Sequence, residues 1–476
     1  MNQRGLAPLI IIVIVILIVG AGAGGFLAFQ EKKAPSLEKE KAIPQEESLQ
    51  KMEEGTESLE TDVTENVTIP IKPTPPPAPA IQPLNPKTQP NERTTQHEEF
   101  SKDITSPVEP TPLLPPVPSN ALSQIFSAGK CSGKGLVVLT SPPVKMADTI
   151  YILPMGLMSG SHVTPVDHLY FHTSHKNAGR YDVLAPADGY VVSVEKVGDS
   201  QDYRLIIEHT CTFYSIYIHV TELAPKILHA IKNSSQRSWT MRVPVRAAEA
   251  IGTKVPNIQE KTFQVDFSVA NAEFVLNGFI TPGYYKGEPW KIHTDDIYKY
   301  YEEPLKSELI KKSVRTAPPI SGKIDYDIDG RLVGNWFRAG TNGYSGSNPY
   351  QYWEGHLTIA YDYIDPTKIR ISMGNWEGKS ENGAVVGNTP DPKDVSPETG
   401  LVKYELIDAH YVHANGQLWD QETFADDIRL DISKPYLLGT LLVQLIDKRT
   451  LKLETFPGKS ASAVGGFSAN AVMYER

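Results

Sequence analysis

The segment YRLIIEHTCTFYSIYIHV, residues 203–220, indicates the fold more clearly than any other part of the chain. Tyr, Ile, Phe and Val are concentrated in residues 203–210 and 213–220, and these residue types are typical of β-strands. Only Cys211 and Thr212 separate the two runs. We therefore predict two short strands here, one directly after the other.

Similar strand-like segments surround this one, at residues 135–140, 190–197 and 262–269. They are short and are separated by Pro and Gly, which predicts an all-β unit over residues 121–290. A second β-rich unit is predicted over residues 319–476. Its strand-like segments are residues 323–337, 356–364, 368–374, 436–447 and 450–456. Turn signals such as Asp329-Gly330 favour an antiparallel sandwich or barrel.

A helical connector is predicted between the two units, over residues 291–318. Residues 293–313 have the composition of a helix. Thr294 or Asp295 can cap its start, and Pro304 can kink or restart it. The predicted fold class is therefore mainly β, with two antiparallel β-rich domains joined by this connector.

The N-terminal segment, residues 6–29, is apolar and contains no charged residue. At about 1.5 Å per residue it is long enough to cross the roughly 30 Å hydrocarbon layer of a bilayer. A cleaved secretory signal is the alternative, but its apolar region is usually only about 7–15 residues long. We expect residues 1–30 to form a single-pass anchor in the cell membrane, with the N-terminus inside and the β domains outside.

Residues 31–120 differ sharply in composition from the β units. Glu and Lys dominate up to residue 65, and proline is abundant from residue 66 onward. Such a segment buries too little apolar surface to offset its ordering entropy, and its prolines favour an extended chain. It is predicted to be a disordered stalk.

Charge and cysteine content exclude several classes of protein. The formal net charge is −10 at pH 7, and no basic stripe that would bind nucleic acid is present. The two cysteines, Cys131 and Cys211, are too few for a disulfide framework. They can form one bridge outside the cytosol or remain as two buried thiols, and the sequence leaves both alternatives open.

Histidines are concentrated in the first β unit: His162, His168, His172, His175, His209, His219 and His229. His168 and His172 are four residues apart, so in a strand both side chains point to the same side. Imidazoles placed in this way can bind a metal ion. The alternative is a chance accumulation of histidines in a polar loop.

The order of motifs in this unit resembles that of the lysostaphin-type zinc endopeptidases. In that family a His-x-x-x-Asp segment precedes a strand of the form V-x-A-x-x-D-G-x-V, a strand ending in Tyr-x-His, and a last strand with His-x-His. Here DHLYFH (167–172) precedes VLAPADGYVV (183–192), Tyr217-Ile218-His219 and FQVDFSV (263–269). The resemblance covers about residues 135–270 and implies the duplicated hybrid motif fold.

The resemblance also implies roles for individual residues. His168 matches the first metal ligand, His172 stands in place of the metal aspartate, and His219 matches a catalytic histidine. In the last motif, Gln264-Val265-Asp266 replaces His-x-His. His168, His172 and Asp266 could still bind zinc, whereas glutamine cannot transfer a proton near neutral pH.

One departure leaves the alignment with the family ambiguous. His162 and Asp167 form a rival His and Asp pair, but their spacing is one residue too long for the family pattern.

Three functional hypotheses follow. The first is a non-catalytic module that binds an envelope polymer or protein; the second is an active zinc hydrolase with His219 as general base. The third is a structural membrane protein with the same fold. In the C-terminal unit, Trp336, Tyr350 and Trp353 are candidates for binding sugar rings, although such residues are more often part of a β-domain core.

Overall fold

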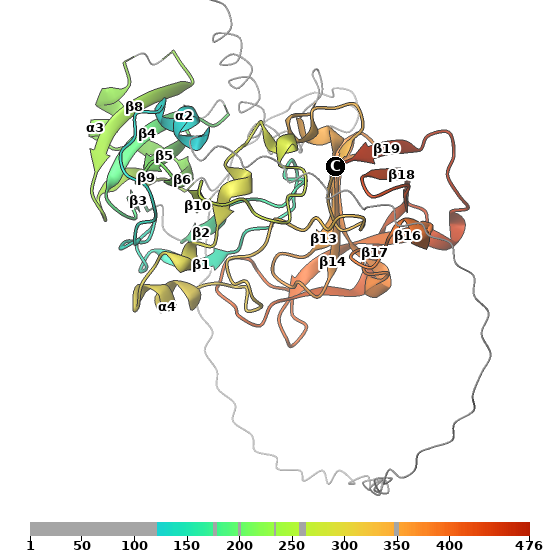
Figure 1. Ribbon diagram of the computed structural model, residues 1–476. Helices are drawn as coiled ribbons and strands as arrows, with labels where there is room; N and C mark the ends of the chain where they lie inside the picture. Colours follow the sequence, from blue (N-terminus) through green and yellow to red (C-terminus); the bar gives the residue numbers. More distant parts are fainter. Residues whose placement is uncertain (1–120, 175–178, 199–200, 233–234, 257–262, 347–351) are drawn as a thin grey trace, which may run out of the picture. The chain divides into compact units, whose positions relative to one another are not determined.

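The computed structural model describes residues 121–476 with the exception of 175–178, 199–200, 233–234, 257–262 and 347–351 (Figure 1). The anchor predicted at residues 6–29 and the stalk predicted at 31–120 lie outside the described residues. Within the described ranges, no helix is long and apolar enough to cross a membrane. The described chain is mainly β, with few helices.

The first β unit is built on an eight-stranded antiparallel sheet. Its order is β1-β2-β10-β6-β5-β4-β8, and β11 pairs with β10. The strands are β1 (Thr149–Leu153), β2 (Leu169–Thr173), β4 (Gly189–Lys196), β5 (Tyr203–Glu208), β6 (Phe213–Val220), β8 (Ser238–Val245), β10 (Gln264–Asn271) and β11 (Thr294–Asp295). The predicted strands at 203–210 and 213–220 are therefore confirmed as β5 and β6, which pair with each other.

A smaller sheet packs against the large one. It has the order β3-β9-β7 and consists of β3 (Tyr181–Leu184), β9 (Ala250–Lys254) and β7 (Glu222–Leu223). The buried hydroxyl of Tyr217, on β6, donates to the carbonyl of Leu184, on β3, at 2.8 Å. Val183, Ile207 and Phe267 are fully buried in the shared core. Two short helices accompany these sheets, α2 (Ala121–Ser127) and α3 (Pro225–Ala230).

The motif Asp188-Gly189 lies at the start of β4, and its glycine is required for packing. A Cβ atom at Gly189 would lie 2.5 Å from the carbonyl oxygen of Glu208 on the neighbouring strand. Asp188 accepts a hydrogen bond from the backbone N–H of Ala247 at 2.8 Å. The pair therefore fixes the close approach of β4 to its neighbours.

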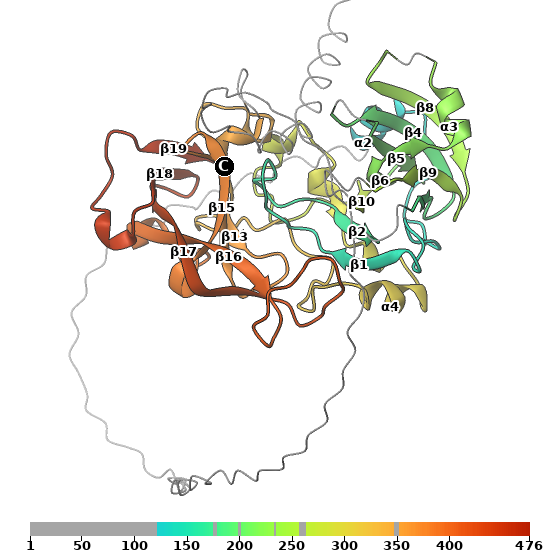
Figure 2. The same ribbon diagram turned by 180° about the vertical axis from the view of Figure 1, so that it is seen from behind.

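The C-terminal unit is a closed barrel of eight strands, which is one of the two architectures predicted. The labels in Figure 2 locate most of its strands. They are β12 (Gly334–Arg338), β13 (His356–Tyr361), β14 (Ile369–Trp376), β15 (Lys379–Val385), β16 (Leu401–Val412), β17 (Arg429–Leu445), β18 (Thr450–Pro457) and β19 (Val472–Glu475). The barrel closes because β12 pairs with both β13 and β19.

The helix predicted over residues 293–313 is largely wrong. Only α4 (Leu305–Ile310) is α-helical, and Pro304 precedes it as its N-cap residue. The rest contains two single 3₁₀ turns, η3 (Lys291–His293) and η4 (Ile297–Lys299), together with β11. Tyr298, Tyr300 and Tyr301 are buried in the core of the first unit, so tertiary packing overrides the local helical preference.

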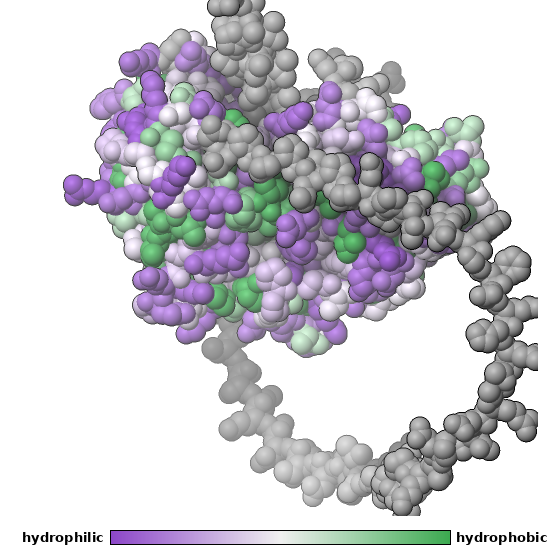
Figure 3. All heavy atoms as spheres, in the orientation of Figure 1, coloured by the Kyte–Doolittle hydropathy of each residue, from purple (hydrophilic) through white to green (hydrophobic). Residues whose placement is uncertain are grey.

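On the side shown in Figure 3, hydrophilic and hydrophobic residues are interspersed. The most exposed large apolar side chains, Tyr436 and Leu418, are 74% and 67% exposed. Isolated exposed apolar residues of this kind are ordinary in soluble domains.

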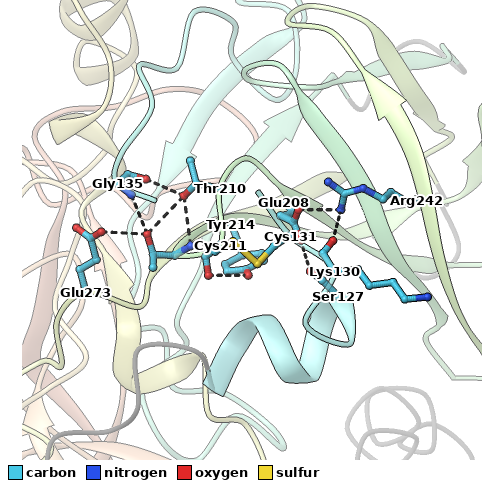
Figure 4. Close-up of a disulfide and its surroundings, with 11 residues drawn as sticks. Ser127, Lys130, Cys131, Gly135, Glu208, Thr210, Cys211, Tyr214, Arg242 and Glu273 are labelled. Atoms are coloured by element: carbon cyan, nitrogen blue, oxygen red, sulfur yellow. Dashed lines mark hydrogen bonds and ion pairs between the residues drawn. A yellow bond between two sulfur atoms is a disulfide. The ribbon is translucent and has the colours of Figure 1, made fainter. Parts of the chain in front are cut away.

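Cys131 and Cys211 form a disulfide, so of the two alternatives left open by the sequence the structure has the bridge (Figure 4). The segment before Cys131 is also held by polar contacts. Arg242 donates to the carbonyl of Lys130 at 2.7 Å and to Glu208 at 2.9 Å. The bridge and these bonds fasten the N-terminal segment of the described chain to the sheet.

Replacing both cysteines by serine should lower the free energy of unfolding by about 2–4 kcal/mol, because the bridge closes a long loop and restricts the unfolded chain. Urea denaturation of the oxidised wild type and of the double variant measures this difference. Wild-type protein treated with a reductant is the matched control and should behave as the variant does. Equal stabilities of oxidised and reduced protein would contradict the predicted contribution.

Candidate functional site

The register of β1, β2 and β10 assembles the candidate residues on one face of the large sheet. Directly opposed residues of antiparallel strands point to the same face. One row across the three strands contains Tyr151, His172 and Gln264. The next row contains Leu153, Tyr170 and Asp266. We call these six residues, together with His168 and His219, the site face.

The carboxylate of Asp266 is the centre of this face. It is 3% exposed, and its Oδ2 atom lies 3.0 Å from Nε2 of His168. Nε2 of His219 lies 3.5 Å from the same oxygen. A buried carboxylate is stable only when it is paired, and here two imidazoles share the pairing.

His168 is itself held between two carboxylates. Its Nδ1 lies 3.3 Å from Oδ1 of Asp167, on the side opposite Asp266. Burial alone would lower the pKa of His168, but Asp266 and Asp167 outweigh it and raise the pKa to about 9. His168 is therefore an imidazolium at neutral pH.

His219 is paired in the same way from the end of β6. Its Nδ1 lies 2.6 Å from Oδ2 of Asp202. Burial lowers its pKa, but Asp266 and Asp202 more than compensate, and the pKa is raised. The backbone of His219 has φ +69°, which is uncommon for a residue other than glycine.

Two further residues border the cluster. Burial and the charge of His168 lower the pKa of His162 to about 4, and its ring centroid lies 6.3 Å from that of His168. Lys291 is buried, donates to the carbonyl of Pro165 at 2.7 Å, and helps to keep the pKa of Asp167 low although burial opposes this. His162 is thus a neutral neighbour of the ion pairs.

His172 does not join His168 and Asp266. It lies opposite Gln264, one row away from Asp266, and its ring stacks on Tyr151 with centroids 4.3 Å apart. In the described part of the chain, no three His, Cys, Asp or Glu side chains are grouped so that they could hold a metal ion. Of the three predicted zinc ligands, the structure brings His168 and Asp266 together as an ion pair and places His172 one row away.

Gln264 occupies the place where the resemblance expects a catalytic histidine. Its side-chain oxygen accepts a hydrogen bond from the backbone N–H of Phe263 at 3.0 Å. The amide can form a hydrogen bond with the backbone of its own segment, but it cannot exchange a proton with a substrate near neutral pH. This position therefore cannot supply acid–base catalysis.

Of the three aromatic residues that were candidates for binding sugar rings, the two that the structure describes differ in their burial. Trp336 is fully buried in the barrel core, and its Nε1 donates to the carbonyl of Leu332 at 2.8 Å, so its predicted role in sugar binding is wrong. Trp353 is half-buried, on the turn η6 (Tyr352–Gly355). Tyr350 lies outside the described residues.

Sequence reasoning did not identify Asp202, Lys291 or Tyr151 as parts of this site. Asp202 lies in a polar turn before β5, and Lys291 lies in the connector. Neither belongs to a motif, and only the folded chain brings them to the cluster. Tyr151 could have been suspected only from its strand-like surroundings.

No family model and no curated protein matches the chain. Among solved structures, the SpoIIQ–SpoIIIAH pore-forming complex contains a similar chain, with 14% identity, 36% of this chain and 96% of that chain covered, and a TM-score of 0.22. A putative M23 peptidase from Pseudomonas aeruginosa is 14% identical, and the match covers 32% of this chain and 54% of that chain, with a TM-score of 0.20. Lysostaphin from Staphylococcus simulans is 13% identical, and the match covers 56% of this chain and 98% of that chain, with a TM-score of 0.23. Likenesses this weak do not establish a family for the chain.

The raised pKa of His168 predicts that the protein loses stability as the pH rises. A group whose pKa is higher in the folded than in the unfolded state stabilises the fold fully below the unfolded value, here about 6.5. That contribution disappears as the pH passes through the folded value of about 9. The free energy of unfolding should therefore fall by on the order of 2 kcal/mol between these two pH values.

Denaturant titrations at a series of pH values test this expectation. His168→Gln should reduce the slope in this window, and the part due to His219, whose pKa is also raised, should remain. His410→Gln is the matched control, because the side chain of His410 is 66% exposed. A wild-type slope that survives His168→Gln unchanged would show that another group causes it.

Proposed function

We propose that the first β unit is a non-catalytic binding module on a peptidase-like scaffold, which holds a protein or polymer of the cell envelope. The observation that carries this proposal is the pairing of Asp266 with both His168 and His219. A carboxylate engaged in this way, next to Gln264, forms a closed charge network rather than a set of catalytic groups.

The protonation states of the cluster argue against general-base catalysis. A general base must be unprotonated at the working pH and free to accept a proton. Both imidazoles of the network have raised pKa values. His168, with a pKa of about 9, is protonated at neutral pH, and Asp266 and Asp202 shift the pKa of His219 in the same direction.

The site face retains polar atoms that a ligand could satisfy. Oδ1 of Asp266 and the hydroxyl of Tyr170 are buried and have no hydrogen-bond partner among the described residues. Buried polar atoms without partners destabilise a protein by about 1–3 kcal/mol each. A ligand with N–H or O–H donors, such as a peptide or a glycan, would recover this free energy.

Envelope localisation is part of the same proposal. The apolar segment 6–29 would insert in the bilayer, and the stalk would carry the β units outside the membrane. The disulfide between Cys131 and Cys211 supports this location, since such bonds persist mainly in oxidising compartments.

An active zinc hydrolase is the second candidate, and one observation favours it. Oδ2 of Asp167 and Oδ1 of Asp266 are buried oxygens without a hydrogen-bond partner in the described part of the chain. A divalent cation prefers such anionic oxygens. To bind zinc, however, His168 would first have to lose the proton that its two carboxylates stabilise.

A hydrolysis assay on the full-length chain in detergent, with peptidoglycan and peptide libraries and with zinc added, tests this proposal. We expect no cleavage above that of the variant His219→Ala. The double variant Gln264→His/Asp266→His restores the family's last motif and frees His168 from its buried partner. It should bind zinc at least about tenfold more tightly than the wild type, because it adds a nitrogen ligand in place of an ion pair.

The single variant Gln264→His is the matched control for this experiment, because it leaves the Asp266 ion pairs in place. Cleavage by the wild type that disappears in His219→Ala would contradict the proposal and favour the hydrolase.

A further inference from the structure

The β1 end of the site face is covered by a segment of the C-terminal barrel. Residues 413–428, which connect β16 to β17, lie next to β1 in both ribbon views (Figures 1 and 2). Trp419 and Ala425 of this connection share one buried apolar cluster with Tyr151 and Tyr170. We call residues 413–428 the cap.

Tyr151 joins the cap to the site face. One side of its ring stacks on His172 at 4.3 Å between centroids, and Trp419 approaches it edge-on at 5.6 Å. Its hydroxyl donates to the backbone carbonyl of Gln421 in the cap at 2.5 Å. Tyr151 therefore lies between the candidate site and the barrel, with a contact on each side.

The cap is braced internally, and the backbone N–H of its Trp419 donates to the carbonyl of Tyr411, on β16, at 2.9 Å. His413 and Asp427, at its two ends, lie 2.9 Å apart, and Asp420 accepts hydrogen bonds from the backbone N–H groups of Glu422 and Thr423. Nε1 of Trp419 donates to the carbonyl of Thr423 at 2.9 Å. These bonds give the cap one defined conformation, so that Trp419 is presented to Tyr151.

The second row of the site face is covered from the same side. Tyr170 is 6% exposed and packs in one cluster with Tyr363 and Ile364, which follow β13. The unpartnered hydroxyl of Tyr170 is thus sealed from water by barrel residues. An extended ligand lying along β2 would have to take the place of Trp419 and Tyr363.

We propose that the cap is an autoinhibitory element, which blocks the site face until it is displaced and thereby controls when a ligand can bind. The inference rests on the proposed function only in taking the site face as the surface that binds ligand. When the cap moves away, the rows that contain His172 and Tyr170 become accessible. The free energy needed for this movement is set mainly by the contacts of Tyr151 and Trp419.

Histidine modification by diethyl pyrocarbonate, followed by mass spectrometry of the full-length chain in detergent, measures access to the site face. The exposed His410 serves as an internal reference in every sample. In the wild type, His172 should react at least about tenfold more slowly than His410, because reaction requires local opening. Trp419→Ala should raise the rate at His172 at least about fivefold relative to His410, since it removes the ring that covers Tyr151.

Tyr151→Phe is the second variant, for the case that Trp419→Ala disturbs the fold. It retains the stacking on His172 and removes only the hydrogen bond to Gln421, so the rate should rise about two- to tenfold. Leu418→Ala is the matched control in the cap, because this side chain is 67% exposed, and it should leave the rate unchanged.

Two outcomes would overturn the proposal. Either His172 reacts as fast as His410 in the wild type, or both cap variants leave its rate unchanged while circular dichroism shows an intact fold. Neither outcome depends on catalysis or on a particular ligand. Hydrolytic activity would therefore refute the proposed function and leave the proposal for the cap intact. Fast modification of His172 in the wild type would refute the proposal for the cap and leave the proposed function intact.

Discussion

The buried carboxylate of Asp266 is the constraint around which the first β unit is arranged. Asp266 is only 3% exposed, so its charge must be compensated by a nearby positive charge. His168, directly before β2, and His219, at the end of β6, lie close enough to do so. Delivering the second imidazole involves a left-handed backbone conformation at His219, which is tolerated because two carboxylates hold the side chain. To bind a metal ion through His168, this network would have to release the proton that Asp266 and Asp167 stabilise. The ion pairs of Asp266 with His168 and His219 stabilise the sheet electrostatically.

The barrel completes this arrangement rather than forming an independent unit. Residues 121–476 belong to one compact unit, and Phe337 and Tyr344 of the barrel are buried in the core of the first unit. Lys291 of the connector contributes to both parts, since its ammonium group donates to Pro165 and lies 5.4 Å from the ring of Tyr344. Residues of the barrel and of the first β unit are therefore buried in shared clusters, one of which includes Tyr151 and Tyr170 of the site face. Access to the ion pairs depends on the barrel as much as on the sheet that carries them.

Much of the architecture could be predicted from sequence, and the failures have identifiable physical causes. Strand composition located β5 and β6, and turn signals indicated a sandwich or a barrel, but closure depends on the pairing of β12 with β19, which are far apart in the chain. The connector was predicted as a helix because local preference says nothing about the burial of Tyr298 and Tyr300. At the site, motif order singled out His168, His219 and Asp266, which the structure does bring together. It could not show that His172 lies opposite Gln264, one row from Asp266, because the alternation of a strand gives the face of a residue but not its row.

The zinc content of the full-length chain tests the central claim, that Asp266 is committed to two imidazoles rather than to a metal ion. Protein purified without chelator, incubated with excess zinc and passed over a desalting column would be analysed by elemental mass spectrometry. Asp408→Ala provides a matched control, since that carboxylate is 53% exposed and lies on β16 of the barrel. We expect well below about 0.1 zinc per chain for the wild type and for both Asp266→Ala and Asp408→Ala, because the ion pairs leave no ligand set for the metal. About one zinc per chain, lost in Asp266→Ala and kept in Asp408→Ala, would contradict the claim and make the cluster a metal centre.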